Sequence, residues 1–384
     1  MYKVKCFDKI AKCGLDKLGN GYVFTDDIAE ADVALVRSSS LHEIDAGENL
    51  FAVARAGAGV NNIPVDKFAQ KGIVVFNTPG ANANGVKELV IAALLLSSRD
   101  VIDGVNWVRT IEGDVGKAVE KGKKAFAGKE IAGKKLGVIG LGAIGVLVAN
   151  SAISLGMTVY GYDVNLSIEH ALALKNNIIT VKTLDEMFAE CDYITVHVPL
   201  LESTKYLFNA DAFAKMKDGV NIINFSRDLL VNDEDMCAAI ASGKVHRYVT
   251  DFPNEKVRNM PGAIAVPHLG ASTSESEDNC AVMAVGQLKD YAATGSIKNS
   301  VNFPALDAGS IAGGYRIAVL HKNVPNMIGQ FTALLGKKGI NIVNMANRSK
   351  GNCAYTVIDA EADPAGIAAE LSAIENVYRV RIIK

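Results

Sequence analysis

Three ionisable side chains of different chemistry follow three successive predicted strands in the second half of the chain. Arg227 follows NIINFS, Glu255 follows VTDFPN, and His268 ends AIAVPH. An open α/β sheet binds ligands outside the carboxyl ends of its strands, so we expect these side chains at one ligand-binding edge. An imidazole can exchange a proton and a guanidinium can pair with a carboxylate. Taken singly, each residue has a plainer interpretation: a surface ion pair, a solvated loop residue and a core histidine.

A glycine-rich segment indicates a dinucleotide site. GLGAIG at 140–145 places Gly140, Gly142 and Gly145 in G-x-G-x-x-G spacing, directly after the predicted strand LGVIG and before an apolar helical run. Glycines permit a tight turn and a close approach of the backbone, and the helix N-terminus offers amide hydrogens to a pyrophosphate. The alternative is an ordinary glycine-rich turn between a strand and a helix.

A carboxylate at the end of the next predicted strand bears on the choice of dinucleotide. Asp163 ends YGYD, where a carboxylate can bind both ribose hydroxyls and would repel a 2′-phosphate. Positions 164–168 contain no Arg or Lys, so the sequence favours NAD over NADP. The alternative is that Asp163 only caps the next helix.

Two series of β-rich runs alternate with helical stretches, which predicts parallel βαβ units and an α/β fold. The first series is at 3–7, 32–38, 51–57 and 73–78, and the second is at 136–140, 157–163, 193–198, 219–225, 247–252 and 263–268. The second series fits a doubly wound dinucleotide-binding sheet. A long helix is expected from near Gly85, followed by an irregular crossing from Trp107 to Lys135, where Gly and Lys are frequent.

The C-terminal part is predicted to form a small module. Residues 302–314 are rich in Gly, Ala and Pro, which suggests a linker. The elements beyond it follow the order β-α-β-β-α-β, a ferredoxin-like arrangement. The helix after His268 is expected to return to the first sheet. The expected domains are therefore residues 1–94 with 270–301, residues 95–269, and residues 315–384 after the linker.

The composition excludes several functions. The 384 residues are 49% hydrophobic and 21% charged, which suits a soluble protein of several domains. The net charge of -2 implies no large cationic surface for nucleic acid or anionic lipid. The six cysteines are scattered and no C-x-x-C pair occurs, so we expect no metal site and a cytoplasmic protein. No apolar run approaches the roughly 20 residues of a membrane span.

Several motifs together resemble those of the D-2-hydroxyacid dehydrogenase family. They are NFSR at 224–227, DFPNE at 251–255, PHLGAST at 267–273, RAGAGVNNIPV at 55–65 and NTPGAN at 77–82. The resemblance covers nearly all of residues 1–300, and PHLGAST is most similar to the phosphoglycerate dehydrogenase branch. It implies two doubly wound parallel-sheet domains, namely a Rossmann nucleotide-binding domain and a flavodoxin-like substrate domain.

The resemblance also implies roles for individual residues. His268 would be the general acid/base, Glu255 would hold its imidazole and favour the protonated form, and Arg227 would bind the substrate carboxylate. Contacts to NAD would come from Thr78, Gly140, Gly142, Ala143, Ile144, Gly145, Asp163, Val198, Phe225, Ser226, Thr250, Asp251, Gly270 and Ala271.

Two positions depart from the family pattern. Asp228 stands where the family has Gly after the arginine, and Thr250 stands where a carboxylate contacts the nicotinamide amide. Asp251 could substitute for that carboxylate. Adjacent side chains of a strand face opposite sides, however, so the exchange would require a bulge.

Substrate selection is expected from the first domain. The family's substrate loops match Arg37, Ser38, Ala58, Gly59 and Val60, and Arg37 and Arg55 are candidates for binding a phosphate or are ordinary solubilising charges. The expected substrate is D-3-phosphoglycerate, and the alternatives are another 2-hydroxy acid such as glycerate or lactate. Some relatives instead act as NAD(H)-sensing corepressors that bind protein partners.

The C-terminal module resembles an ACT domain, an amino-acid-sensing unit. HKNVPNMIG at 321–329 is similar to a serine-binding loop, and the resemblance implies that His321, Asn323 and, from a paired module, Asn341 bind L-serine. The alternative is that these residues only cap a helix and satisfy loop backbone. Asn326 replaces the usual glycine there. A homodimer or homotetramer is expected because the family dimerises through its nucleotide domain.

Overall fold

The computed structural model describes residues 1–312 and 314–384 of the chain. They form two compact units: the first unit contains residues 1–81 and 274–384, and the second unit contains residues 82–273. Within the described residues, the structure contains no helix with the length and apolar character needed to span a membrane.

The first unit contains a parallel five-stranded sheet in the order β2-β1-β3-β4-β5, which is the flavodoxin-like order of a doubly wound sheet. Its strands are β1 (Tyr2–Cys6), β2 (Tyr22–Phe24), β3 (Val33–Val36), β4 (Ala52–Arg55) and β5 (Val74–Phe76). The fold class expected from the sequence is confirmed here. Strand β2 escapes prediction because it is a three-residue edge strand in which Phe24 is 61% exposed, so no buried apolar run marks it.

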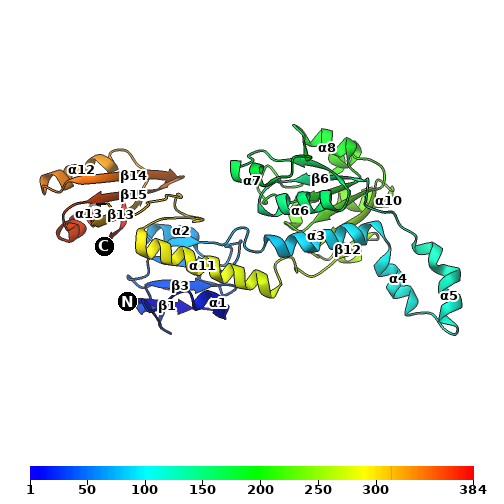
Figure 1. The fold of residues 1–384 in the computed structure, drawn as a ribbon, viewed down its shortest axis with the longest axis horizontal. Helices are drawn as coiled ribbons and strands as arrows, with labels where there is room; N and C mark the ends of the chain where they lie inside the picture. Colours follow the sequence, from blue (N-terminus) through cyan, green and yellow to red (C-terminus); the bar gives the residue numbers. More distant parts are fainter. Residues whose placement is uncertain (313) are drawn as a thin grey trace. The chain divides into compact units, whose positions relative to one another are not determined.

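A helix from late in the chain completes this sheet. Helix α11 (Ser274–Thr294) lies along the strands (Figure 1), where Ala284, Val285 and Leu288 share a core with Val33 and Leu35. The first unit is therefore discontinuous in sequence. Two short helices belong to the same sheet region: α1 (Lys12–Leu15) and α2 (Val65–Gln70).

The second unit contains a parallel seven-stranded sheet in the order β12-β11-β10-β9-β6-β7-β8. Numbered from β6, this is the Rossmann order 3-2-1-4-5-6 extended by one strand. The strands are β6 (Lys135–Ile139), β7 (Thr158–Tyr162), β8 (Ile179–Thr180), β9 (Tyr193–Val196), β10 (Val220–Asn224), β11 (Val245–Thr250) and β12 (Ala263–Ala265). The predicted second series lacks only β8, whose two residues are both exposed.

Helix α3 (Ala83–Ser98) belongs to the second unit. Val86, Val90 and Leu94 on this helix pack in one core with Val138 and Val148. The expected domain boundary after residue 94 therefore falls inside a helix, and the compact unit begins earlier.

Polar caps begin most of the other helices of this unit. The side chains of Ser167, Thr183, Asn209 and Asn232 each accept a backbone N–H of the first helical turn that follows. These helices are α7 (Ile168–Ala173), α8 (Leu184–Glu190), α9 (Ala210–Lys215) and α10 (Asp233–Ala241), and α6 (Ala143–Ser154) follows β6.

The predicted irregular crossing is wrong. Helices α4 (Val101–Val108) and α5 (Val115–Gly122) form an arm that stands out from the rest of the second unit (Figure 1). The side chain of Asp114 accepts the Lys117 N–H at 3.1 Å and starts α5, and the rings of Trp107 and Phe126 lie 5.1 Å apart. A capped helix and an aromatic contact therefore order a segment whose composition suggests a loop.

The module at the end of the chain is ferredoxin-like, as predicted. Its antiparallel sheet has the order β14-β15-β13-β16. Its elements are β13 (Tyr315–Lys322), α12 (Met327–Lys337), β14 (Ile342–Lys350), β15 (Cys353–Ala360), α13 (Ala368–Ser372) and β16 (Val377–Ile383). Short 3-10 turns occur at Ile28–Glu30, Lys123–Phe126, Asp228–Leu230, Val257–Asn259 and Pro364–Ile367.

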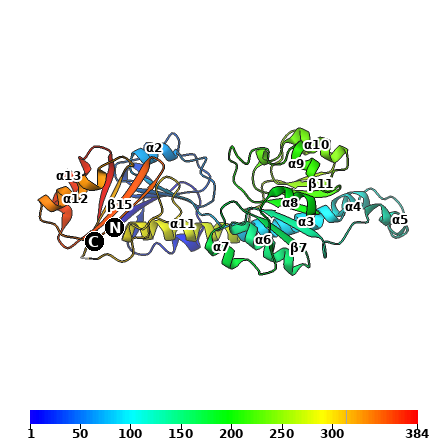
Figure 2. The same cartoon turned by 90° about the horizontal axis from the view of Figure 1, so that it is seen from above.

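Both faces of the module's sheet are covered at β13 and β15, whereas β14 is largely exposed. Helices α12 and α13 cover one face (Figure 2), where Ile317 packs against Phe331. Leu320 and Tyr355 on the other face join the core of the five-stranded sheet. The module therefore lies in the same compact unit as that sheet and does not separate as a third unit.

Candidate active site

The glycine-rich turn between β6 and α6 has the geometry that the sequence predicts. Gly140 has a φ of 90°, and a Cβ there would lie 2.8 Å from the His197 carbonyl oxygen. A Cβ on Gly145 would collide with the Gly140 carbonyl oxygen, whereas one on Gly142 would meet nothing within 4 Å. The first and third glycines are required by packing, and the second leaves open space for a ligand to approach the backbone.

The residues around this turn fit a dinucleotide. Asp163 accepts the Leu141 N–H at 2.7 Å and the Asn165 N–H at 2.7 Å, which holds its carboxylate against the turn. Helix α6, all of which the structure describes, has no side-chain cap and no acidic residue in its first turn. Its positive end at Ala143 and Ile144 is therefore open to an anion such as a pyrophosphate.

A partly buried histidine behind the turn was not among the predicted site residues. His197 follows β9, its Nε2 lies 3.1 Å from Thr195 Oγ1, and its Nδ1 is buried with no hydrogen-bond partner among the described residues. Burial lowers the pKa of His197 to about 3. The side chain is therefore neutral in the folded protein, and its backbone touches the position of Gly140.

A buried asparagine shapes the turn that presents Arg227. Asn224 ends β10, and its Oδ1 accepts the N–H groups of Ser226 at 3.1 Å and Arg227 at 3.4 Å. Its Nδ2 donates to the Arg227 carbonyl oxygen at 2.7 Å. Ser226 Oγ donates to the Val196 carbonyl oxygen at 2.7 Å, which joins the turn to β9. These bonds fix the backbone on which the exposed Arg227 side chain stands.

Asp251 provides a buried carboxylate at the same edge of the sheet. Strand β11 ends at Thr250, whose Oγ1 accepts the Phe252 N–H at 3.1 Å. Asp251 therefore lies beyond the strand, and its side chain does not have to follow the alternating directions of strand side chains. Asp251 is 1% exposed and accepts the Gly270 N–H at 3.2 Å. Its Oδ1 has no hydrogen-bond partner among the described residues.

The electrostatics of Asp251 connect it to two predicted catalytic residues. Burial raises the pKa of Asp251, and the Gly270 hydrogen bond and the charges of His268 and Arg227 oppose that rise. An imidazole and a guanidinium therefore act on one buried carboxylate. His268 itself is exposed, with its ring 4.6 Å from that of Phe252.

The structure does not join Glu255 to His268. Glu255 instead pairs with Arg258 at 2.8 Å, and its side chain is 86% exposed. Among the described residues, no hydrogen bond or ion pair links Glu255 to the imidazole. The two partners of the observed ion pair are three residues apart, so a local contact takes the place of the predicted one.

The expected substrate loop in the first unit is organised by a residue that the motifs do not indicate. Asp8 accepts the N–H groups of Arg37 at 2.6 Å and Ser38 at 3.1 Å, and the Ser39 hydroxyl at 2.8 Å. Burial alone would raise the pKa of Asp8, but these hydrogen bonds outweigh it and hold the pKa below its usual value. The amides of Arg37 and Ser38 are therefore already engaged.

The two candidate phosphate ligands have partners of their own. Arg37 pairs with Glu277 at 2.6 Å, and Arg55 donates through Nε to the Arg37 carbonyl oxygen at 3.0 Å. Nearby, the Ala58 carbonyl oxygen accepts the side chain of Asn77 at 2.6 Å. The remaining predicted contacts of this unit, Gly59, Val60 and the buried Thr78, follow β4 and β5.

The predicted effector residues do not converge within one chain. His321 is buried, its ring nitrogens lie 2.8 Å from the Lys322 carbonyl oxygen and 2.9 Å from Thr356 Oγ1, and burial lowers its pKa. Asn323 donates to the Gly351 carbonyl oxygen at 3.1 Å. Asn341 precedes β14 at the end of the sheet opposite to these residues.

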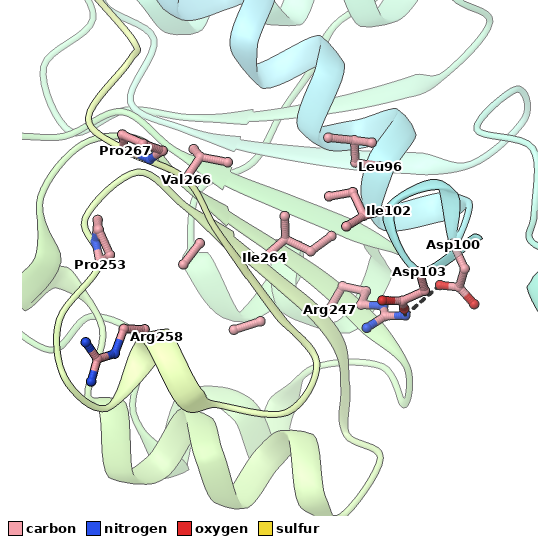
Figure 3. Close-up of a pocket in the computed structure, with 12 residues that line it drawn as sticks. Leu96, Asp100, Ile102, Asp103, Arg247, Pro253, Arg258, Ile264, Val266 and Pro267 are labelled. Carbon is pink, nitrogen blue, oxygen red and sulfur yellow. Dashed lines mark hydrogen bonds and ion pairs between the residues drawn. The ribbon is translucent and has the colours of Figure 1, made fainter. Parts of the chain in front are cut away.

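A cavity of about 530 Å³ lies beside the edge strand β12 of the second unit (Figure 3). At one end Arg247 pairs with Asp100 at 2.6 Å and Asp103 at 2.9 Å. Pro253 and Arg258 line its other side. Neither the glycine-rich turn nor His268 lines this cavity, so it is separate from the predicted active site.

The fold and the glycine-rich turn define a dinucleotide-binding α/β protein. Residues 91–270 match the family model of the D-isomer specific 2-hydroxyacid dehydrogenase, NAD binding domain. The chain is 32% identical over 352 residues to D-3-phosphoglycerate dehydrogenase of Haemophilus influenzae, covering 88% of this chain and 83% of the relative. It is 37% identical over 278 residues to hydroxypyruvate reductase of Thermotoga maritima, covering 68% of this chain and 85% of the relative.

A solved structure adds the cofactor. The NAD⁺-bound 3-phosphoglycerate dehydrogenase of Entamoeba histolytica is 28% identical, with a TM-score of 0.60, and the match covers 79% of this chain and 99% of that one. The chain belongs to the D-isomer specific 2-hydroxyacid dehydrogenases, enzymes with an NAD-binding domain.

Proposed function

We propose that this protein oxidises D-3-phosphoglycerate to 3-phosphohydroxypyruvate, the activity that the names of several of its relatives suggest. The observation that carries the proposal is the place of Asp251 at the edge of the sheet: its carboxylate is buried, accepts the Gly270 N–H at 3.2 Å, and is close enough to His268 and Arg227 for their charges to oppose the rise of its pKa. A carboxylate-binding guanidinium and an acid–base imidazole in one neighbourhood are the two groups that oxidation of a 2-hydroxy acid needs.

The chain's own residues handle the substrate's charge and proton. Arg227 pairs with the substrate carboxylate, and His268 takes the proton of the 2-hydroxyl group as that group becomes a carbonyl. Bound NAD would supply the acceptor for the hydride that leaves C2. The buried Asp251 Oδ1 is available to accept an amide N–H of the cofactor, in place of the carboxylate that Thr250 replaces.

Arg37 and Arg55 are proposed to recognise the phosphate of the substrate. Both are cationic: Arg37 is on the loop held by Asp8, and Arg55 ends β4 and donates to the Arg37 carbonyl oxygen. One observation favours a second candidate, oxidation of an unphosphorylated 2-hydroxy acid such as glycerate: Glu277 already neutralises Arg37. Hydroxypyruvate reductase among the relatives is consistent with that alternative.

A substrate panel distinguishes these possibilities. NADH formation is followed with D-3-phosphoglycerate, D-glycerate and D-lactate, and kcat/KM is expected to favour the phosphorylated acid by at least about tenfold. A preference for glycerate would replace the proposed substrate. A His268→Ala variant is expected to lose about 10²- to 10⁴-fold in kcat while still binding NADH, with His170→Ala as the control outside the predicted site. NADH binding without turnover in the unmodified protein would favour a cofactor-sensing protein.

We also propose that the protein assembles as a homo-oligomer regulated by L-serine. Asn341 lies at the opposite end of the module's sheet from His321 and Asn323, so a site using all three residues requires a second copy. The arm exposes apolar side chains that suit an interface, namely Val101, Val105, Val108 and Val115. Light scattering measures the assembly. Unaltered turnover in millimolar serine, together with no heat of binding, would remove the regulation.

A further inference from the structure

A second cavity, of about 790 Å³, lies entirely within the first unit. Its walls come from three segments far apart in the chain: α11 contributes Gln287 and Asp290, the connecting segment contributes Lys298 and Asp307, and β14 contributes Arg348. The volume is in the range of small-molecule sites. None of the predicted catalytic, cofactor, substrate or effector residues lines this cavity.

One wall of the cavity contains a buried polar atom without a partner. Gln287 is 7% exposed, and its Nε2 donates to the Asn77 carbonyl oxygen at 2.9 Å. Its Oε1 is buried and has no hydrogen-bond partner among the described residues. Buried acceptors are nearly always paired in folded proteins, so this atom calls for a donor. Because the atom is closed to solvent, a ligand with an N–H group reaches it only when the Gln287 side chain turns toward the cavity.

Charges of both signs line the cavity and remain unpaired. In the part of the chain that the structure describes, no ion pair involves Asp290, Asp307, Lys298 or Arg348. Asp307 uses one oxygen to accept the Gly309 N–H at 3.0 Å, and Arg348 donates only to the Asn347 carbonyl oxygen at 3.4 Å. Two carboxylates and two cations that do not neutralise one another can receive a ligand bearing both charges.

Apolar residues complete the lining. Ile297, Leu306 and Ala346 lie between the charged groups, and they offer a surface for a small hydrocarbon part of a ligand. A dicarboxylate would be repelled by the acidic pair, Asp290 and Asp307. A polyamine would find no partner in the basic pair, Lys298 and Arg348. A zwitterion with a short side chain matches the whole set.

We propose that this cavity binds a free α-amino acid. The ammonium group is received by Asp290 and Asp307, joined by the Gln287 carbonyl once that side chain turns toward the cavity, and the carboxylate is received by Lys298 and Arg348. The site is distinct from the loop at His321 and Asn323. Because its walls belong to both α11 and β14, an occupant connects the C-terminal module to the five-stranded sheet.

The test is calorimetric titration of the full-length protein with each of the twenty proteinogenic L-amino acids. Arg348→Gln and Asp290→Asn are expected to weaken the binding of the selected amino acid by at least about tenfold. Lys337→Gln on α12 and Asp278→Asn on α11 remove the same charges outside the cavity and are expected to leave the affinity unchanged. Both cavity positions are exposed, so the variants should fold.

Three outcomes would overturn the proposal. They are no binding by any amino acid, binding that the cavity variants do not weaken, and binding that Asn323→Ala or Asn341→Ala abolishes while the cavity variants retain it. The last outcome assigns the ligand to the effector loop. The titration needs no substrate and no turnover, so its result stands apart from the proposed dehydrogenase activity.

Discussion

The side-chain amide of Asn224 forms two hydrogen bonds with the backbone of Arg227: it donates to the carbonyl oxygen at 2.7 Å and accepts the N–H at 3.4 Å. The asparagine is fully buried and the arginine side chain is exposed. The core of the sheet thereby sets the direction in which a solvent-facing guanidinium leaves the chain. A residue with no contact to substrate can therefore control how well Arg227 binds it.

Replacement of Asn224 by Ala should lower kcat/KM by about 10- to 100-fold, because the turn that carries Arg227 loses its internal hydrogen bonds. This loss should exceed the loss that an Arg227→Lys variant causes through a higher KM alone. The reason is that Asn224→Ala releases both the N–H and the carbonyl group of Arg227. Steady-state kinetics on the folded variant measure it.

Asn232→Ala is the matched control for this prediction. Asn232 also accepts two backbone N–H groups, from Glu234 and Asp235, but it caps α10. It should cost about 1 kcal/mol of stability and leave kcat/KM unchanged. Equal kinetic effects of the two variants would mean that Asn224 acts only through stability.

Glu255 can assist His268 only by leaving Arg258, with which it forms an exposed ion pair. Exposed pairs contribute at most about 1 kcal/mol, so the exchange is inexpensive. Glu255→Gln should lower kcat by about 10- to 100-fold through loss of the carboxylate that orients the imidazole. Arg258→Gln removes the competing partner and should maintain or raise kcat. If both variants change kcat equally and slightly, the ion pair is structural and Glu255 has no part in catalysis.

The parts of the fold and site that the sequence predicts are those with a fixed spacing or a buried apolar run. Gly140, Gly145 and Asp163 meet because strand, turn and helix follow one another without interruption. Strands β2 and β8 are not predicted from the sequence because they are short, exposed edge strands. Their formation depends on pairing with a neighbour and not on their own composition.

Contacts made by single polar side chains are harder to predict. Asn224 and Asp8 bind backbone groups whose positions depend on where strands end, and no residue spacing encodes that. Glu255 is found with Arg258 because a neighbour three residues away outcompetes a partner set by tertiary structure. The arm became helical because Asp114 caps α5, although its Gly and Lys content suggests a loop.

His197 should make stability fall as the medium becomes acidic. Burial lowers its pKa in the folded protein to about 3, against an ordinary value of 6.5 for histidine. Below about pH 6.5, His197 therefore binds a proton in the unfolded chain but stays unprotonated in the folded chain. The free energy of unfolding consequently decreases as pH falls. Between pH 7.5 and 5.5 this residue alone should remove about 1 kcal/mol of unfolding free energy.

A His197→Gln variant should show a shallower decline over that range, by about the same 1 kcal/mol, in urea unfolding followed at several pH values. His170→Gln, at a helical position on the surface of the same unit, serves as the control and should retain the slope of the parent. Parallel slopes for parent and His197→Gln would mean that the buried ring is protonated without penalty.

The ion pair between Arg37 and Glu277, at 2.6 Å, determines how much positive charge is available for a phosphorylated substrate. Glu277→Gln removes the competing carboxylate and should lower KM for D-3-phosphoglycerate several-fold, because Arg37 can then pair with the phosphate. Arg37→Gln should raise that KM by about tenfold or more. Neither change should alter KM for D-glycerate, which has no phosphate to recognise.

Initial rates with both acids give the comparison, and Lys12→Gln on α1 provides a charge control in the same unit. Shifts of equal size for the two substrates would show that Arg37 and Glu277 only hold the loop in place, and phosphate recognition would then have to be sought at Arg55.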